Sequence, residues 1–383
     1  MTDNGKTMEA MLCAALRAES VAWPEPAPAV FEQQLQACAA SHGIGPLLSR
    51  QLTVNACPSQ DRLRRLFPAR QVKDAEAIEL ARRVELARVL KALAAAGVRP
   101  LLLKGVALAY SIYPSPGLRS RADTDVLIHG SERSICDRVL SDSGYVKANA
   151  NRGELIQYQC GYAMRDRFGI EHVLDVHWRV SNTQLFSLTL GYDELSLRAV
   201  CLKALGEYAR GPAPAHALLH ACLHRAHHLH SPMFVDGARA AGGDRLIWLY
   251  DIHLLVESMS SRELLEFAGL AERKRIRAVC REGLLRAHEC FATRLPEEIL
   301  SALTREGQAE PSEAHLRRGA LQHLLTEVRS LPRWQDRAQL LREHLFPPTD
   351  YMLEKYAVSN RIWLPMLYLR RGVHGAWKRM QSP

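Results

Sequence analysis

The sequence lacks the features that mark secreted, membrane-spanning and disulfide-built proteins. No segment reaches the roughly 18 uninterrupted apolar residues of a membrane span, and the N-terminus has no charged stretch followed by an apolar one. Its nine cysteines are scattered without a CxxC pair, which argues against a zinc knuckle or a disulfide framework. No internal repeat or low-complexity tract is found. We therefore expect a folded, cytoplasmic protein with reduced thiols.

The bulk composition is that of an ordinary globular chain. Hydrophobic residues make up 47% and charged residues 24% of the 383 residues, which excludes a fibrous or largely disordered protein. This length allows two or three domains. The formal net charge of +9 is compatible with anionic ligands such as nucleotides, RNA or membrane surfaces, although many basic proteins bind none of these.

Hydrophobic periodicity divides the chain into three regions. Residues 1–72 carry apolar positions at helical spacing, and residues 206–383 are again dominated by amphipathic helical patterns. Between them, residues 73–205 alternate between helical and strand patterns. We therefore predict an N-terminal helical region, a central region that holds the strands, and a C-terminal helical domain.

The longest helical pattern opens the central region, from Asp74 to the residues before Gly97, an apt C-cap. We expect one broad apolar stripe of this helix to face the core. The members of the predicted stripe are Ile78, Leu80, Ala81, Val84, Leu86, Val89, Leu90 and Leu93.

Four patterns after this helix predict strands. The segment "PLLLKG" indicates a strand that ends in a tight turn, and "DTDVLI" a second strand. A helix is expected from Ser131 to about Gly144. The segments "QYQCGYAMRD" and "EHVLDVHWRV" then predict a hairpin around "RFG" that is added to the sheet.

Two aspartates stand at the start of the second strand. Residues i and i+2 of a strand face the same way about 6.6 Å apart, so Asp123 and Asp125 project side by side while Thr124 points away. Carboxylates are preferred ligands of Mg²⁺, and two such ions about 4 Å apart neutralise a triphosphate and activate an attacking oxygen. The alternative is a surface turn capped by Asp123, because a bare DxD matches by chance in many sequences.

Cationic groups stand close to this pair in the sequence. Lys104 and Gly105 end the first strand and open a helix, where free N–H groups and the helix dipole can hold phosphate. Arg119 and Arg121 directly precede the aspartates and suit a site where phosphate and metal meet. Two alternatives stay open for these arginines: solvated loop charges, or partners for the aspartates.

A third acid, Asp175, lies in "VLDVHWRV" on the same face as His177. Burial of a carboxylate costs free energy unless the carboxylate is paired or binds a metal. A carboxylate on an adjacent strand would complete a metal site and act as the base for an incoming hydroxyl. Alternatively, Asp175 only pairs with Arg179 or His172.

The segment "HALLHACLHRAHHLH" places histidines on successive turns of one helix face, since residues four apart are neighbours. These are His216, His220, His224 and His227 or His228. We expect His220 and His224 to line the nucleotide site. A zinc site and a polar core are the alternatives, although no HExxH pattern or cysteine pair supports zinc.

Two features of the C-terminal region have no assigned chemistry. Asp251, within "IWLYDIHLL", is expected to interact with one of the histidines or with a helix terminus. The segment "NRIWLPMLYLRRGVHGAWKRM" has a composition seen in nucleic-acid surfaces and interfacial helices. More often, such a segment is an amphipathic packing helix.

Together, these segments resemble a known family. "LLLKGVALAYSIYPSPGLRSRADTDVLI", the later "LDVHW" and "RLIWLYDIHLL" are similar to the uncharacterised nucleotidyltransferase family within the polymerase-beta-like nucleotidyltransferase superfamily. The resemblance covers roughly residues 30 to 260. It implies an α+β fold, in which a small mixed β-sheet with helices on one face forms the nucleotidyltransferase core, here residues 73–205.

The resemblance also implies the positions of the functional groups. The superfamily has a glycine turn after the first strand, DxD on the second strand and a third acid on a later strand, which Gly105, Asp123, Asp125 and Asp175 match. His220 also matches a histidine common in the family, as does His224. One departure is the turn, which has no hydroxyl residue after its glycine. Phosphate contacts must then come from backbone amides, Lys104 or the nearby arginines.

The expected function is metal-dependent transfer of an NMP from an NTP to an acceptor, with release of pyrophosphate. Mg²⁺ or Mn²⁺ is the implied cofactor, and the acceptor, whether RNA, protein, peptide or small molecule, is left open. The catalytic and metal-binding residues are Asp123, Asp125 and Asp175. The nucleotide-binding residues are Lys104, Gly105, Arg119, Arg121, His220 and His224.

Two alternative functions stay open. The turn without a hydroxyl residue motivates a catalytically degenerate nucleotide-binding protein or a toxin-antitoxin partner. A DxD glycosyltransferase is disfavoured, because its apolar strand normally precedes the acids. Here the apolar run follows Asp125.

Overall fold

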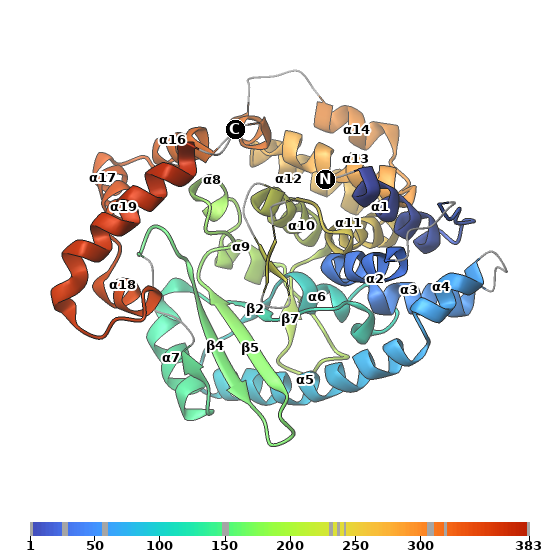
Figure 1. Cartoon of the computed structure of the whole chain (residues 1–383), viewed down its shortest axis with the longest axis horizontal. Coiled ribbons are helices and arrows are strands. Elements are labelled where there is room, and N and C mark those ends of the chain that lie inside the picture. The colour runs from blue at the N-terminus through green and yellow to red at the C-terminus, as the bar shows by residue number, and fades with distance from the viewer. Residues whose placement is uncertain are drawn as a thin grey trace.

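The computed structural model describes residues 3–24, 30–55, 60–147, 153–229, 233–235, 238–240, 243–304, 310–317 and 320–380. A five-stranded sheet lies among helices, with α1 to α4 on one side of the view in Figure 1 and α16 to α19 on the other. The N-terminal helices are α1 (Asp3–Leu16), α2 (Phe31–His42), α3 (Gly45–Val54) and α4 (Asp61–Leu66). No described helix is long and apolar enough to cross a membrane. The eight cysteines among the described residues are free thiols.

The central sheet is mixed, as predicted, and has the strand order β1-β2-β5-β4-β3. Its strands are β1 (Leu101–Leu102), β2 (Thr124–Leu127), β3 (Val146–Lys147), β4 (Gln159–Arg165) and β5 (Glu171–His177). Strands β2 and β5 are parallel, and the other neighbouring pairs are antiparallel. The predicted hairpin is confirmed, since β4 pairs with β5 along its whole length.

Helices and two further strands complete the central region. They are α5 (Arg70–Ala95), α6 (Lys104–Ala109), α7 (Arg133–Asp142), α8 (Gln184–Ser187), α9 (Tyr192–Leu197), β6 (Val200–Cys201) and β7 (Arg210–Gly211), with 3₁₀ turns η2 (Pro116–Leu118) and η3 (Gly130–Glu132). In Figure 1, α5 runs along the lower edge of the molecule. The expected helix between the second strand and the hairpin is therefore confirmed as α7.

Alternation along the strands sends neighbouring side chains into two different cores. Val126 and Val176 point to one face of the sheet, where they pack with residues of α5 and α7. Leu127 points to the other face and joins the larger core of the helical regions. Because Asp125 is two residues from Leu127, it faces that second side. Asp175 faces the same side as Asp125, because it is next to Val176 in β5 and adjacent residues of a strand point to opposite faces.

Helix α5 confirms the longest predicted helix but not the whole of its apolar stripe. It ends before Gly97, whose φ of 84° lies in the left-handed region. The C-terminal half buries Leu86, Val89, Leu90 and Leu93 as expected, whereas Ile78, Leu80 and Val84 are exposed. The N-terminal half buries Glu79 instead, because that carboxylate pairs with Arg121.

The C-terminal region is helical, as predicted, apart from one short strand pair. Its helices are α10 (Pro214–Leu229), α11 (Leu246–Ser258), α12 (Ser261–Arg273), α13 (Arg277–Phe291), α14 (Glu297–Thr304), α15 (Pro311–Arg317), α16 (Ala320–Ser330), α17 (Trp334–Leu345), α18 (Thr349–Lys355) and α19 (Leu364–Met380), with the 3₁₀ turn η4 (Arg361–Trp363). The strand pair is β8 (Met233–Val235) with β9 (Ala238–Ala240). His230 lies outside the described residues.

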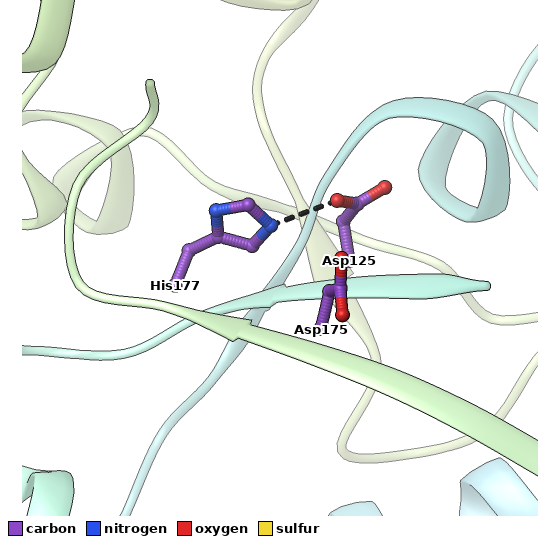
Figure 2. A group of neighbouring side chains, drawn as sticks. All are labelled: Asp125, Asp175 and His177. Carbon is purple, nitrogen blue, oxygen red and sulfur yellow. Dashed lines mark hydrogen bonds and ion pairs between the residues drawn. The ribbon is translucent and has the colours of Figure 1, made fainter. Parts of the chain in front are cut away.

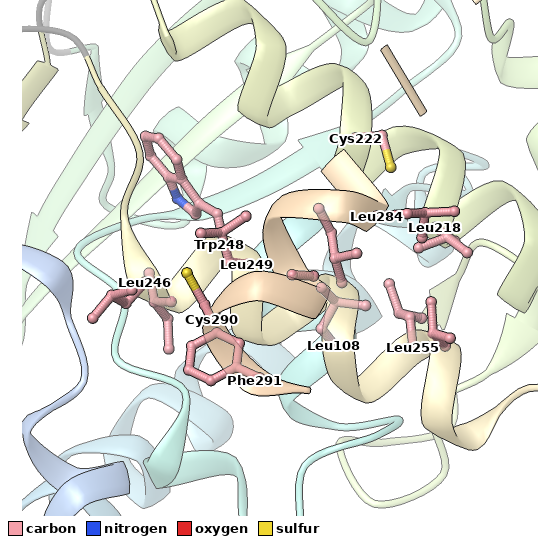
Figure 3. Packing of buried hydrophobic residues seen from close by; sticks show 14 of the residues in the cluster. Leu108, Leu218, Cys222, Leu246, Trp248, Leu249, Leu255, Leu284, Cys290 and Phe291 are labelled. Carbon is pink, nitrogen blue, oxygen red and sulfur yellow. The ribbon is translucent and has the colours of Figure 1, made fainter. Parts of the chain in front are cut away.

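The main core holds α10 and α11 in place above the sheet. Figure 3 shows Leu218 of α10, Leu249 of α11 and Leu284 of α13 packed close to Leu108 of α6. The same core includes residues of α1 to α3. The division of the chain into three regions stays a prediction, but this shared packing fixes the polar faces of α10 and α11 relative to the first strand and its turn.

The basic aromatic segment near the C-terminus forms η4 and α19. Leu367 is buried, and the hydroxyl of Tyr368 donates a hydrogen bond to the carbonyl of Pro347 at 2.7 Å. Ile362, Met366 and Leu369 are exposed. The segment therefore packs through one helix face, and its role stays open. The side chains of residues 373–380 lie outside the described part of the chain.

Candidate active site

The parallel pairing of β2 and β5 brings two acids together. Asp125 lies directly opposite Asp175 in the register. Asp123 stands just before β2, which begins at Thr124. Asp125 is only 5% exposed, whereas Asp123 and Asp175 are partly exposed. All three carboxyl groups lie close enough for their charges to interact.

Asp125 is bound by two neighbouring side chains. Its Oδ1 accepts a hydrogen bond from the Nζ of Lys104 at 2.5 Å and lies 2.8 Å from the Nε2 of His177 (Figure 2). The ammonium comes from the turn after β1, and the imidazole from the end of β5. Three separate segments of the central region therefore meet at one carboxylate oxygen.

Asp125, Asp175 and His177 form a compact group of possible metal ligands. Each residue offers one ligand atom, and the three atoms lie within 4.8 Å of one another (Figure 2). The Nδ1 of His177 is buried and has no hydrogen-bond partner among the described residues. Two carboxylates and an imidazole whose Nε2 faces them fit a divalent cation. Asp123, which the sequence predicted as a ligand, stands outside this group.

Asp175 is oriented by amide side chains. Its Oδ2 accepts a hydrogen bond from the Nε2 of Gln159 at 2.8 Å, and the Oε1 of Gln159 accepts one from the Nδ2 of Asn182 at 2.9 Å. The alternative partners considered from the sequence are engaged elsewhere: His172 lies beside Asp166, and Arg179 donates to the hydroxyl of Ser187.

The three acids differ in proton affinity. Burial alone would raise the pKa of Asp125, but the Lys104 charge and the contact with His177 hold that pKa below its usual range. Burial and the charge of Asp125 raise the pKa of Asp175. Burial, with the charges of Asp125 and Asp175, raises the pKa of Asp123 to about 6. Asp125 is therefore the permanent anion of the group.

The turn after β1 has a residue in the left-handed region, but it is not the glycine. Lys104 has a φ of 52°, a conformation that costs a non-glycine residue about 1 kcal/mol or more. Gly105 leaves space instead, because a Cβ there would be crowded at 3.2 Å from the Nη1 of Arg119. The strained backbone of Lys104 accompanies the contact of its ammonium group with Asp125.

Arg119 is buried in a two-pronged ion pair. Its Nε and Nη2 donate to the two carboxylate oxygens of Asp251 on α11 at 2.7 and 2.6 Å, and the hydroxyl of Tyr113 donates to the same carboxylate at 2.7 Å. The expectation that Asp251 answers a histidine or a helix terminus is therefore wrong. The pair fixes the loop before β2 to α11.

Arg121 is held on the opposite side of the loop by α5. Its Nη2 donates to the Oε1 of Glu79 at 2.8 Å, and its Nη1 contacts the hydroxyl of Thr124. The Nε of Arg121 is buried and has no hydrogen-bond partner within the described ranges. Neither arginine is a solvated loop charge, and neither pairs with the side chains of Asp123 or Asp125. Both still border the cleft described below.

The histidines of α10 face the acids across this cleft. His224, His227 and His228 line it, and His220 lies behind them in a small cavity next to Lys104. Burial and the Lys104 charge lower the pKa of His220 and that of His227 to about 4. Burial and the charge of His227 lower the pKa of His228 to about 3. These histidines are therefore neutral at pH 7. His216 points elsewhere, 3.7 Å from Glu194.

The cleft between the two walls has about 390 Å³ of open space. Several of its lining residues were not predicted from the sequence as site residues: His177, Gln159, Asn182, Arg245 and Trp248. His177 was detectable, since its place two residues after Asp175 puts it on the same strand face. The others come from distant segments, and no local pattern marks them.

Comparison with known proteins gives a family for the chain. The family described as uncharacterised nucleotidyltransferase matches residues 29–292, a range that contains the whole sheet, α10 and α11. A search of curated proteins found no match. The family match spans well over half of the chain, and the mixed sheet with helices around it is consistent with a nucleotidyltransferase fold. The chain belongs to the uncharacterised nucleotidyltransferase family.

Proposed function

We propose that the protein is a metal-dependent nucleotidyltransferase that moves an NMP from an NTP to a hydroxyl acceptor and releases pyrophosphate. The observation that carries the proposal is the register of Asp125 opposite Asp175 in parallel strands, at a cleft large enough for a nucleotide. Membership in a nucleotidyltransferase family supports it independently.

Asp125, Asp175 and His177 would hold a divalent cation, and Asp123 stands at the edge of the group. A bound cation supplies neutralisation of the triphosphate charge and of the charge that develops on the leaving group. Lys104 adds a fixed ammonium beside the carboxylates. The two arginines before β2 are committed to ion pairs, so we assign them to positioning the loop and to the electrostatic potential of the cleft.

The reaction forms one P–O bond and breaks another. The acceptor oxygen attacks the α-phosphorus in line, the bond to the β-phosphate breaks, and pyrophosphate leaves with the electron pair. The acceptor proton passes to Asp175. Burial and Asp125 raise the pKa of Asp175, which makes it a better proton acceptor than an ordinary carboxylate near neutral pH. Gln159 holds this carboxylate in place.

The test is pyrophosphate release from each α-labelled NTP with Mg²⁺ or Mn²⁺ and a panel of acceptors. Asp123→Asn is expected to reduce the rate by roughly 10²-fold or more, because it removes a carboxylate charge that would help to hold the divalent cation beside the triphosphate. Asp142→Asn is the matched control, since Asp142 is exposed on α7. Release that persists unchanged in Asp123→Asn would end the catalytic assignment.

A second candidate function is nucleotide binding without transfer. The observation in its favour is the ammonium of Lys104 on Asp125, which supplies an internal cation to the acid group. In that case, NTP binding measured by calorimetry would not depend on divalent ions, and no acceptor would become labelled. Metal-dependent labelling of any acceptor decides for the transferase.

A further inference from the structure

His177 gives the candidate metal group a nitrogen donor. It is the last residue of β5 and shares a strand face with Asp175, while β2 places Asp125 beside them. The imidazole is 2% exposed, and it lies within 4.8 Å of both carboxylates at the ligand atoms. A third carboxylate in this place would give a purely oxygen-based site. The chain has an imidazole there instead.

Only one of the two ring nitrogens of His177 has a polar partner among the described residues. Its Nε2 lies on the Oδ1 of Asp125, an oxygen that also accepts from Lys104. Its Nδ1, on the side of the ring away from Asp125 (Figure 2), is buried and has no partner in the part of the chain that the structure describes. A purely structural buried histidine normally satisfies its polar atoms. His172, on the other face of the same strand, contacts Asp166 and has no orphaned ring nitrogen among the described residues.

The donor set decides between the cations that nucleotidyl transfer uses. Mg²⁺ is a hard ion that takes oxygen ligands in near-ideal octahedral geometry. Carboxylates suit both Mg²⁺ and Mn²⁺, whereas imidazole is a ligand of transition-metal ions, and of these two cations only Mn²⁺ is a transition-metal ion. Two carboxylates, one imidazole and an open cleft therefore match Mn²⁺ better than Mg²⁺. A closed tetrahedral zinc site is a poorer match, because the group opens onto the cleft.

We propose that Asp125, Asp175 and His177 form a site that selects Mn²⁺ over Mg²⁺, and that His177 determines this selectivity. The proposal rests on the proposed function only in taking this ion to be the one used for nucleotidyl transfer. The selectivity itself is a property of metal binding. It is measured on the full chain without nucleotide.

The first measurement is Mn²⁺ binding to the metal-free protein, followed by the loss of the free-ion signal in electron paramagnetic resonance and by competition with Mg²⁺. Mn²⁺ is expected to bind at least about tenfold more tightly than Mg²⁺. His177→Asp is expected to bring the ratio of the two affinities close to one, because it restores an all-oxygen set. His172→Gln is the matched control and keeps the wild-type ratio.

The second measurement separates ligation from a structural role. Pulsed electron paramagnetic resonance of the Mn²⁺ complex is expected to show coupling to an imidazole nitrogen in the wild type and in His172→Gln. The coupling is absent in His177→Asp. Absence of nitrogen coupling in the wild type overturns the proposal even if the variant fails to fold.

The outcomes also separate this proposal from the proposed function. Selective Mn²⁺ binding with nitrogen coupling, but with no transfer to any acceptor, would support the Mn²⁺ site and contradict the proposed transferase activity. Transfer that proceeds equally with both ions, with equal affinities in the wild type and His177→Asp, keeps the transferase and overturns the role of His177.

Discussion

The two walls of the cleft carry opposite kinds of chemistry. The sheet wall holds three acids beside Lys104, and its central acid, Asp125, stays ionised because Lys104 and His177 lower its pKa against the effect of burial. The helix wall holds histidines that burial keeps neutral, with pKa values of about 4 for His220 and His227. One wall is therefore suited to cations and phosphate charge, and the other to neutral hydrogen bonding.

The walls are also fixed by different forces. The sheet wall depends on backbone register, since one ladder of hydrogen bonds sets Asp125 opposite Asp175. The helix wall depends on side-chain packing, together with ion pairs such as that of buried Arg225 with Asp244 at 2.7 Å. Because of this difference, substitutions in the two walls should have different effects on the protein. Losses on the sheet wall should affect chemistry, and losses on the helix wall should affect stability or orientation.

The sharpest test compares one residue from each wall. Asp125→Asn removes the permanent anion and is expected to lower the rate of transfer by about 10³-fold. His220→Gln keeps a neutral hydrogen-bonding group and is expected to cost less than about 10²-fold, since it only disturbs orientation. Rates are compared at saturating NTP, with folding checked by circular dichroism. Equal losses in the two variants would contradict the division of tasks.

The link between the walls is the buried pair of Arg119 and Asp251. Asp251→Asn leaves the guanidinium of Arg119 without its charge partner and is expected to lower the free energy of unfolding by about 3 kcal/mol. The control is Asp350→Asn, whose partner Arg361 is 3.7 Å away on the surface, where the expected change is about 0 to 1 kcal/mol. Urea unfolding measures both. Similar effects at the two sites would mean that the buried pair does not hold the loop.

The neutrality of the helix wall predicts an acid-sensitive fold. The pKa of His220 is about 4 in the folded protein, below the ordinary value of 6.5, so the unfolded chain binds more protons between these pH values. The stability that comes from keeping His220 neutral is fully present above pH 6.5 and is lost as the pH falls toward 4. From pH 7.5 to 5 we expect a loss of about 2 kcal/mol from His220 alone. Urea unfolding of His220→Gln should show a correspondingly shallower pH dependence, and an unchanged one would contradict a neutral wall.

The sequence predicted the sheet wall better than the helix wall, for a physical reason. Asp125 and Asp175, which the parallel register brings together, stand in strands where the alternation acts locally, and the short DxD spacing connects Asp123 to Asp125. The order of helix, strand and hairpin followed from periodicity in the same way. His177 could have been included by the same alternation, two residues after Asp175.

What the sequence did not predict depends on contacts between distant segments. The partner of Asp251 is Arg119, 132 positions away in the chain, and the partner of Arg121 is Glu79 on α5. Neither pairing leaves a local pattern. The same holds for Leu80 on α5, whose exposure depends on where Glu79 had to be buried.

The smallest effect we predict concerns Gly105, where the sequence suggested a close backbone approach to phosphate. The structure gives another reason for this glycine, because an added Cβ would lie 3.2 Å from the Nη1 of Arg119 and 3.3 Å from its Cζ. Arg119 cannot move away easily, since Asp251 holds it at both ends of its guanidinium. Gly105→Ala is therefore expected to cost about 1 kcal/mol of stability through crowding. Gly130→Ala is the matched control, because no atom of the residues that the structure describes lies within 4 Å of a Cβ there. In the Asp251→Asn background Arg119 is freer to shift, so Gly105→Ala should cost less stability there. This double-mutant cycle measures whether the ion pair between Arg119 and Asp251 sets the space at the turn after β1.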